Sequence, residues 1–209
     1  MGIQSNLIFI VLSVLAIVTK YTSPNNLYRL FKLLPILFLI IWVTSFGNFQ
    51  SNPYTRAILA RLCFSIIGDS LLLFPAQFKS GLFSFLIGHI WYMLGFLSGD
   101  WSLPLLPTLI ITILALGMFF QLYPTLGKLK IPVLMYIFMI AGMGITSFGR
   151  LEALQTFPTL IGAIGASLFM ISDGVLGWNK FKNPFHLAEG IILITYYSGQ
   201  WMISYSTLM

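Results

Sequence analysis

The stretch AILARLCFSIIGDSLLLF, residues 57–74, consists almost entirely of apolar side chains but includes Arg61 and Asp69. A helix needs about 20 mostly apolar residues to cross a lipid bilayer, so this stretch predicts a transmembrane helix. Charged side chains within such a helix are energetically costly and mark functional positions by default. The stretch therefore predicts both the class of protein and two candidate site residues.

Apolar runs of similar length fill the rest of the chain, and short connections containing Pro, Gly or Asn separate them. The eight runs are Leu7–Val18, Leu30–Phe46, Ala57–Phe74, Gly81–Leu97, Leu103–Tyr123, Ile131–Phe148, Phe157–Gly177 and Leu187–Leu208. The alternating pattern of a membrane barrel is absent, so the runs predict helices. We expect an all-α, polytopic membrane bundle with eight transmembrane helices, in one transmembrane domain over residues 1–209. The first run is expected to be a retained span, because no basic residue precedes it.

The composition also indicates that the chain lies in a lipid bilayer. The chain is 58% hydrophobic and 8% charged, whereas a soluble domain carries about 25% charged residues. The net charge of +6 comes from basic residues that stand singly or in pairs at the ends of the runs. This placement favours contact with anionic lipid head groups, and we expect no nucleic-acid partner. The single cysteine, Cys63, excludes an intramolecular disulfide, and a homo-oligomer stays open.

Loop charge predicts the orientation. The odd-numbered connections and their flanks hold eight basic residues, Lys20, Arg29, Lys32, Lys79, Lys128, Lys130, Lys180 and Lys182. The other side holds three, namely Arg56, Arg61 and Arg150. The positive-inside rule places the odd connections in the cytoplasm and both termini outside it.

Five ionisable residues from five runs gather near these cytoplasmic ends: Lys32, Asp69, His89, Asp173 and Glu189. At 1.5 Å per residue, Asp69 lies about 9 Å from its end, Asp173 about 7.5 Å and His89 about 12 Å. Helical spacing places further polar side chains on the same faces, among them Arg61, Tyr92, Tyr196 and Gln200. Because independent structural charges have no reason to share a depth, this layer is a candidate site.

The two aspartates also suggest an internal repeat. Asp69 and Asp173 are 104 residues apart, half the chain, and Tyr92 and Tyr196 have the same separation. A shift of four helices preserves direction, so this spacing predicts a weak 4+4 parallel repeat about an axis normal to the membrane. Other positions do not follow it, since His89 falls opposite Leu193.

Structural roles stay open for several of these residues. Asp69 and Asp173 could be ion-paired with Arg61 or Lys32 to hold helices together, and Glu189 could only complement a helix dipole. His89 could be a hydrogen-bonded core histidine. No pair of residues has the spacing H-x-x-x-H or H-x-x-x-D, so we expect no metal, and no cofactor is indicated.

The order and spacing of six blocks together carry a family resemblance: Phe31–Pro35, Leu62–Pro75, Gly88–Tyr92, Gly165–Asp173, Asn179–Phe181 and Tyr196–Gln200. On these blocks the chain resembles the YhhN family, which includes the eukaryotic lysoplasmalogenases. The resemblance covers nearly the whole chain. It differs at Lys32, which that family commonly follows at once with proline, whereas here Pro35 comes three residues later.

The resemblance implies hydrolysis of the vinyl-ether bond of lysoplasmalogen to a fatty aldehyde and glycerophospho-ethanolamine or -choline. It also implies that Asp69 and Asp173 are the catalytic pair. Vinyl ethers hydrolyse through an oxocarbenium ion, and paired carboxyl groups stabilise a transition state of the same kind in glycosidases. Lys32 and Arg61 could bind the phosphate. The remaining expected substrate-binding residues are His89, Tyr92, Glu189, Tyr196 and Gln200.

Two other functions stay open. The chain could be a lipid or small-molecule transporter that uses its acids as a proton relay. It could also hydrolyse the ester of a lysophospholipid, although the sequence has no G-x-S-x-G nucleophile motif.

Overall fold

The computed structural model describes residues 3–22 and 26–208, and this part of the chain folds into eight α-helices without any β-strand. The helices are α1 (Ile3–Thr22), α2 (Asn26–Phe46), α3 (Pro53–Leu72), α4 (Phe78–Phe96), α5 (Leu105–Leu122), α6 (Lys130–Leu154), α7 (Phe157–Phe181) and α8 (Ala188–Tyr205). Each contains most of one predicted apolar run. The predicted all-α, polytopic helical bundle is therefore confirmed.

Local sequence signals set several helix ends. Asn52 precedes α3, and its side chain accepts a hydrogen bond from the Tyr54 N–H at 3.0 Å. Thr156 precedes α7 and forms a reciprocal capping box with Thr159. Both helices have proline in the first turn, where the missing N–H costs nothing. These polar caps fix where two of the central helices begin.

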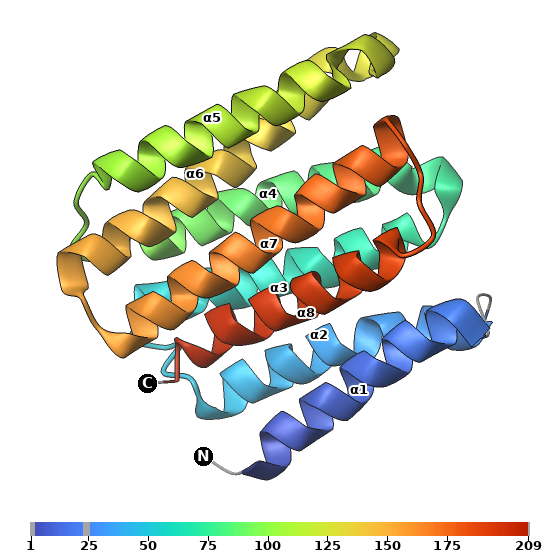
Figure 1. Cartoon of the computed structure of the whole chain (residues 1–209). Helices are drawn as coiled ribbons and strands as arrows, with labels where there is room; N and C mark the ends of the chain where they lie inside the picture. The colour runs from blue at the N-terminus through green and yellow to red at the C-terminus, as the bar shows by residue number, and fades with distance from the viewer. Residues whose placement is uncertain (1–2, 23–25, 209) are drawn as a thin grey trace.

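The eight helices lie side by side and alternate in direction (Figure 1). α1 and α2 form one edge of the bundle, and α5 and α6 form the other. The most extensive helix contacts are those of α3 with α4 and of α7 with α8. The main core lies among these central helices and includes Tyr92, Phe169 and Tyr196. In contrast, α5 buries only Ile111 and Leu122, so most of its apolar surface faces outward.

Five helices, α1, α2, α5, α6 and α7, are both long enough and apolar enough to cross a membrane. The chain is therefore a multi-pass integral membrane protein. α3, α4 and α8 have 20, 19 and 18 residues, so they are long enough, but charged or polar side chains interrupt their apolar sequences. Their buried faces carry Arg61, His89 and Gln200, so this polarity points into the bundle and not toward lipid.

The connections after α3, α5 and α7 lie at one end of the bundle, together with the last residues of α1 and the first of α2 (Figure 1). α1 begins and α8 ends at the opposite end. The end that holds the connections after α3, α5 and α7 carries the eight basic residues counted above, and we call it the basic end. The loop-charge pattern thus groups residues that share one end in space.

Candidate functional site

A polar cavity of about 550 Å³ lies between α2, α3, α7 and α8. Lys20, Arg29, Pro75, Asn179 and Glu189, all close to helix termini at the basic end, form its outer wall. Deeper in the same cavity lie five polar or ionisable side chains, Lys32, Asp69, Ser172, Asp173 and Tyr196. The cavity thus brings together five of the nine predicted site residues, including both aspartates.

Asp69 is held at both carboxylate oxygens. The Lys32 ammonium lies 3.2 Å from Oδ1, and the Tyr196 hydroxyl donates a hydrogen bond of 2.7 Å to Oδ2. The Tyr197 hydroxyl donates to the Lys32 backbone carbonyl at 2.9 Å. These contacts join α2, α3 and α8 around a charged pair. The Lys32 and Asp69 side chains are almost fully buried, so the pair has a fixed geometry.

Asp173 is held at one oxygen only. The Tyr136 hydroxyl donates to Oδ2 at 3.0 Å, and His89 Nε2 lies 3.3 Å from the same atom. The His89 ring stands edge-on to the rings of Tyr136 and Phe169, with centroids 5.3 Å away in each case. Asp173 therefore joins α4, α6 and α7, and neither of its two polar contacts comes from a Lys or Arg.

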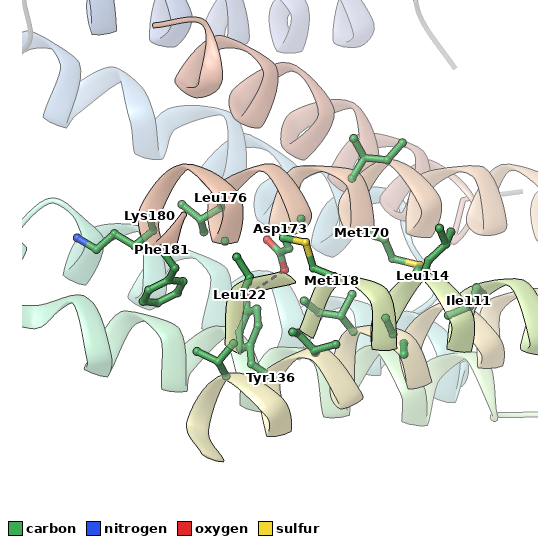
Figure 2. Close-up of a pocket in the computed structure, with 18 of the residues that line it drawn as sticks. Ile111, Leu114, Met118, Leu122, Tyr136, Met170, Asp173, Leu176, Lys180 and Phe181 are labelled. Atoms are coloured by element: carbon green, nitrogen blue, oxygen red, sulfur yellow. Dashed lines mark hydrogen bonds between the residues drawn. The ribbon is translucent and has the colours of Figure 1, made fainter. Parts of the chain in front are cut away.

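An apolar cavity of about 490 Å³ lies on the other side of Asp173, between α5, α6 and α7 (Figure 2). Ile111, Leu114 and Met118 of α5 face Met170 and Leu176 of α7 across it. Four residues line both cavities: Phe78, Asp173, Leu176 and Lys180. Asp173 is therefore the one carboxylate at the junction of a polar and an apolar space.

Comparison with known proteins gives the family. The model of the YhhN family matches residues 27–207. The chain belongs to the YhhN family. It is 34% identical to a human protein named lysoplasmalogenase TMEM86B, over 86% of this chain and 74% of that one. It is 31% identical to the Bos taurus protein named lysoplasmalogenase TMEM86A, over 90% of this chain and 80% of the relative.

A bacterial relative matches over nearly the whole of both chains. The uncharacterized membrane protein YhhN of Escherichia coli O6:H1 is 29% identical over 90% of this chain and 91% of its own. No solved structure matches the chain. The predicted resemblance to the YhhN family is thus confirmed.

In this YhhN-family chain, Arg61, Tyr92 and Gln200 line neither cavity. Arg61 is two turns before Asp69 on α3, so it lies about 12 Å farther from the basic end. Its guanidinium carbon lies 5.1, 5.0 and 4.9 Å from the ring centroids of Phe85, Tyr92 and Phe169, respectively. No hydrogen-bond partner of its guanidinium is found among the described residues. Arg61 is thus a fully buried cation enclosed by aromatic rings.

Tyr92 and Gln200 form a hydrogen-bonded chain in the same deeper layer. The Tyr92 hydroxyl donates to Gln200 Oε1 at 2.5 Å, and Gln200 Nε2 donates to the Ser65 hydroxyl at 2.8 Å. These contacts join α3, α4 and α8. Tyr92 and Gln200, both predicted to bind substrate, therefore lie in a buried network below the polar cavity, where they connect helices.

Glu189 lies at the outer wall of the polar cavity, where it pairs with Lys20 at 3.2 Å. Tyr136 could not be predicted from the sequence, because it stands in an apolar part of α6, where a tyrosine is common. The sequence did not indicate a role for Tyr197 either. Among the described residues, no three His, Cys, Asp or Glu side chains gather closely enough to hold a metal ion.

Proposed function

We propose that the chain hydrolyses the vinyl-ether bond of lysoplasmalogen and releases a fatty aldehyde and a glycerophospho-ethanolamine or -choline. The observation that carries the proposal is the meeting of a polar and an apolar cavity at Asp173. The relatives named lysoplasmalogenase, at 31–34% identity, support it.

The two cavities fit the two parts of this substrate. A lysoplasmalogen has one apolar chain and one phosphorylated glycerol head, and the vinyl ether joins them. With the chain in the apolar cavity and the head in the polar cavity, the vinyl ether lies beside Asp173. Such a lipid needs a site that is apolar on one side and polar on the other, as this one is.

We assign the general acid to Asp173 and the base to Asp69. Asp173 contacts no Lys or Arg among the described residues, and both its polar contacts fall on Oδ2. In contrast, Asp69 contacts the Lys32 ammonium, which stabilises a carboxylate. Asp173 also borders the apolar cavity, where the alkene carbon that takes the proton would lie.

In the first step, the protonated Asp173 carboxyl gives its proton to the alkene carbon farther from the ether oxygen. The alkene electron pair forms the new C–H bond, and an oxocarbenium ion results. The Asp69 carboxylate stabilises this cation and accepts a proton from water as the water oxygen bonds to the carbon. The product of these events is a hemiacetal.

In the second step, the hemiacetal collapses. The protonated Asp69 gives its proton to the departing glycerol oxygen, and the Asp173 carboxylate takes the proton of the hemiacetal hydroxyl. The C–O bond to glycerol breaks and the aldehyde C=O forms. Both aspartates return to their starting protonation states, so the cycle needs only water.

The test is aldehyde release from lysoplasmalogen by the purified protein. We expect Asp69→Asn and Asp173→Asn each to lower kcat by about 10²-fold or more, the typical contribution of an acid or base. Asp100→Asn, an exposed acid in the α4–α5 connection, serves as the matched control and should keep full activity. Full activity in both site variants would contradict the acid-pair mechanism.

Two further arms separate the alternatives. A 1-acyl lysophospholipid tests ester hydrolysis, and we expect no fatty acid from it. Sealed vesicles containing the protein test transport, and accumulation of lipid without any product would instead identify a transporter.

We also propose that the lipid enters from the cytoplasmic leaflet, because the positive-inside rule places the basic end in the cytoplasm. A Lys128→Cys variant should react with a membrane-impermeant thiol reagent only after cells are permeabilised. Reaction in intact cells would reverse the orientation.

A further inference from the structure

Four cations line the polar cavity, and two of them already have a carboxylate partner. Lys32 pairs with Asp69 and Lys20 pairs with Glu189, each at 3.2 Å. The other two, Arg29 and Lys180, have no carboxylate within ion-pairing distance among the described residues. The wall of the cavity therefore carries two positive charges that no side chain balances.

Both of these cations lie on aromatic rings at the basic end. The Arg29 guanidinium carbon is 5.3 Å from the Phe74 ring centroid, and the Lys180 ammonium is 4.6 Å from that of Phe78. These contacts hold the cationic groups without neutralising them. The two side chains are exposed, so an anion can reach them.

Helix geometry places the two cations outward of the aspartates. Arg29 is one turn before Lys32 on α2, and Lys180 is two turns after Asp173 on the same face of α7 (Figure 2). The rise from Asp173 to Lys180 is about 10 Å at 1.5 Å per residue. The cations thus stand between the reacting groups and the basic end of the bundle.

We propose that Arg29 and Lys180 form the binding site for the phosphodiester of a single-chain phospholipid. The inference rests on the proposed function, and it names the part of the site that holds the head group. In such a lipid, roughly six bonds of about 1.5 Å link the vinyl-ether carbon to phosphorus, at most about 9 Å. A hydrogen-bond contact of about 3 Å at each end extends this reach, so one molecule can span the rise of about 10 Å from Asp173 to Lys180.

The two side chains suit this ligand in different ways. The planar Arg29 guanidinium can donate two parallel hydrogen bonds to phosphate oxygens, and Lys180 adds a mobile point charge. Of the cations that the sequence offered for the phosphate, Lys32 is engaged by Asp69 and Arg61 is fully buried outside the cavity. Phosphate binding accordingly falls to the outer pair.

The test compares two substrates with the same alkenyl chain, lysoplasmalogen and the 1-alkenylglycerol that lacks the phosphate. We expect Arg29→Gln and Lys180→Gln each to raise KM for lysoplasmalogen about tenfold and to leave kcat nearly unchanged. KM for the alkenylglycerol should not change. Lys128→Gln is the matched control, because Lys128 lies at the same end but lines neither cavity.

An unchanged KM for lysoplasmalogen, or an equal rise for both substrates, would overturn the inference. If the wild type hydrolyses neither substrate, the proposed function fails, and binding of a non-hydrolysable 1-alkyl lysophospholipid then decides about the site. We expect that lipid to bind about tenfold more weakly to both variants. Its displacement by millimolar inorganic phosphate would point to a free-phosphate site and contradict the inference.

Discussion

Lys32 and Tyr136 lie 104 residues apart, and each contacts the aspartate that follows it by 37 residues. The Lys32 ammonium is 3.2 Å from Asp69, and the Tyr136 hydroxyl is 3.0 Å from Asp173. The two contacts thus have the same spacing in the sequence, but the group beside Asp69 is a cation and the group beside Asp173 is a neutral donor. This difference is the reason for assigning the base to Asp69 and the acid to Asp173.

Each aspartate also contacts the fourth helix of the opposite half. Tyr196 of α8 donates to Asp69, and His89 of α4 lies beside Asp173. Contacts exchanged in this way are what a 4+4 parallel repeat predicts. The repeat itself stays a prediction.

Removal of the Tyr136 hydroxyl should slow the reaction. Tyr136→Phe keeps the ring against His89 but removes the hydrogen bond to Asp173. The loss of one such bond, about 1 kcal/mol, predicts a roughly fivefold lower kcat with unchanged KM. Steady-state kinetics of aldehyde release measures both values. Tyr123→Phe, on an exposed tyrosine at the same end, should match the wild type, and a change in KM alone would argue against a role in positioning Asp173.

Breaking the Lys32–Asp69 pair should destabilise the protein. Lys32→Met leaves the buried Asp69 carboxylate without its cation, at an expected cost of about 3 kcal/mol in unfolding free energy. The double variant Lys32→Met/Asp69→Asn removes both charges and should recover most of that loss, yet stay inactive. Unfolding of the purified protein in detergent measures the stability. A double variant as unstable as the single one would show that the ion pair is not the cause.

Gly88 should tolerate no side chain. A Cβ atom at this position would lie 2.4 Å from Arg61 Nη1 and 2.6 Å from Arg61 Cδ. Gly88→Ala therefore forces the buried arginine out of its aromatic enclosure, and overpacking of this kind costs about 1–3 kcal/mol. Gly117→Ala is the matched control, since nothing lies within 4 Å of a Cβ there, and alanine should stabilise that helix by up to about 1 kcal/mol. Equal thermal stability of the two variants would contradict the prediction.

Filling the apolar cavity should discriminate between chain lengths. Ala115 lines this cavity on α5, whereas Ile113, two residues earlier, faces outward and is 60% exposed. Ala115→Trp should lower kcat/KM for a long alkenyl chain about tenfold or more, and much less for a short one, because the lost contacts are those of the distal chain. Ile113→Trp should leave both values unchanged. An equal loss for both chain lengths would place the chain elsewhere.

Several features of the site could be predicted from the sequence because they depend on local spacing. Asp69, His89 and Asp173 fall at similar depths because a helix rises by a constant amount per residue. The wall of the polar cavity accordingly contains Lys32, Asp69, Asp173, Glu189 and Tyr196. In contrast, Tyr136 gave no signal, because its only distinction is a contact with a residue on another helix.

The sequence by itself determined that the chain lies in a membrane, where its helices are, and in which layer the ionisable groups lie. Each of these depends on composition and on the length and period of a helix, which neighbouring residues fix. Only the tertiary structure decided that Lys32 pairs with Asp69, that Arg61 is enclosed by aromatic rings, and that a polar and an apolar cavity meet at Asp173. These relationships depend on the rotation and packing of α2 to α8 against one another, which no single helix specifies.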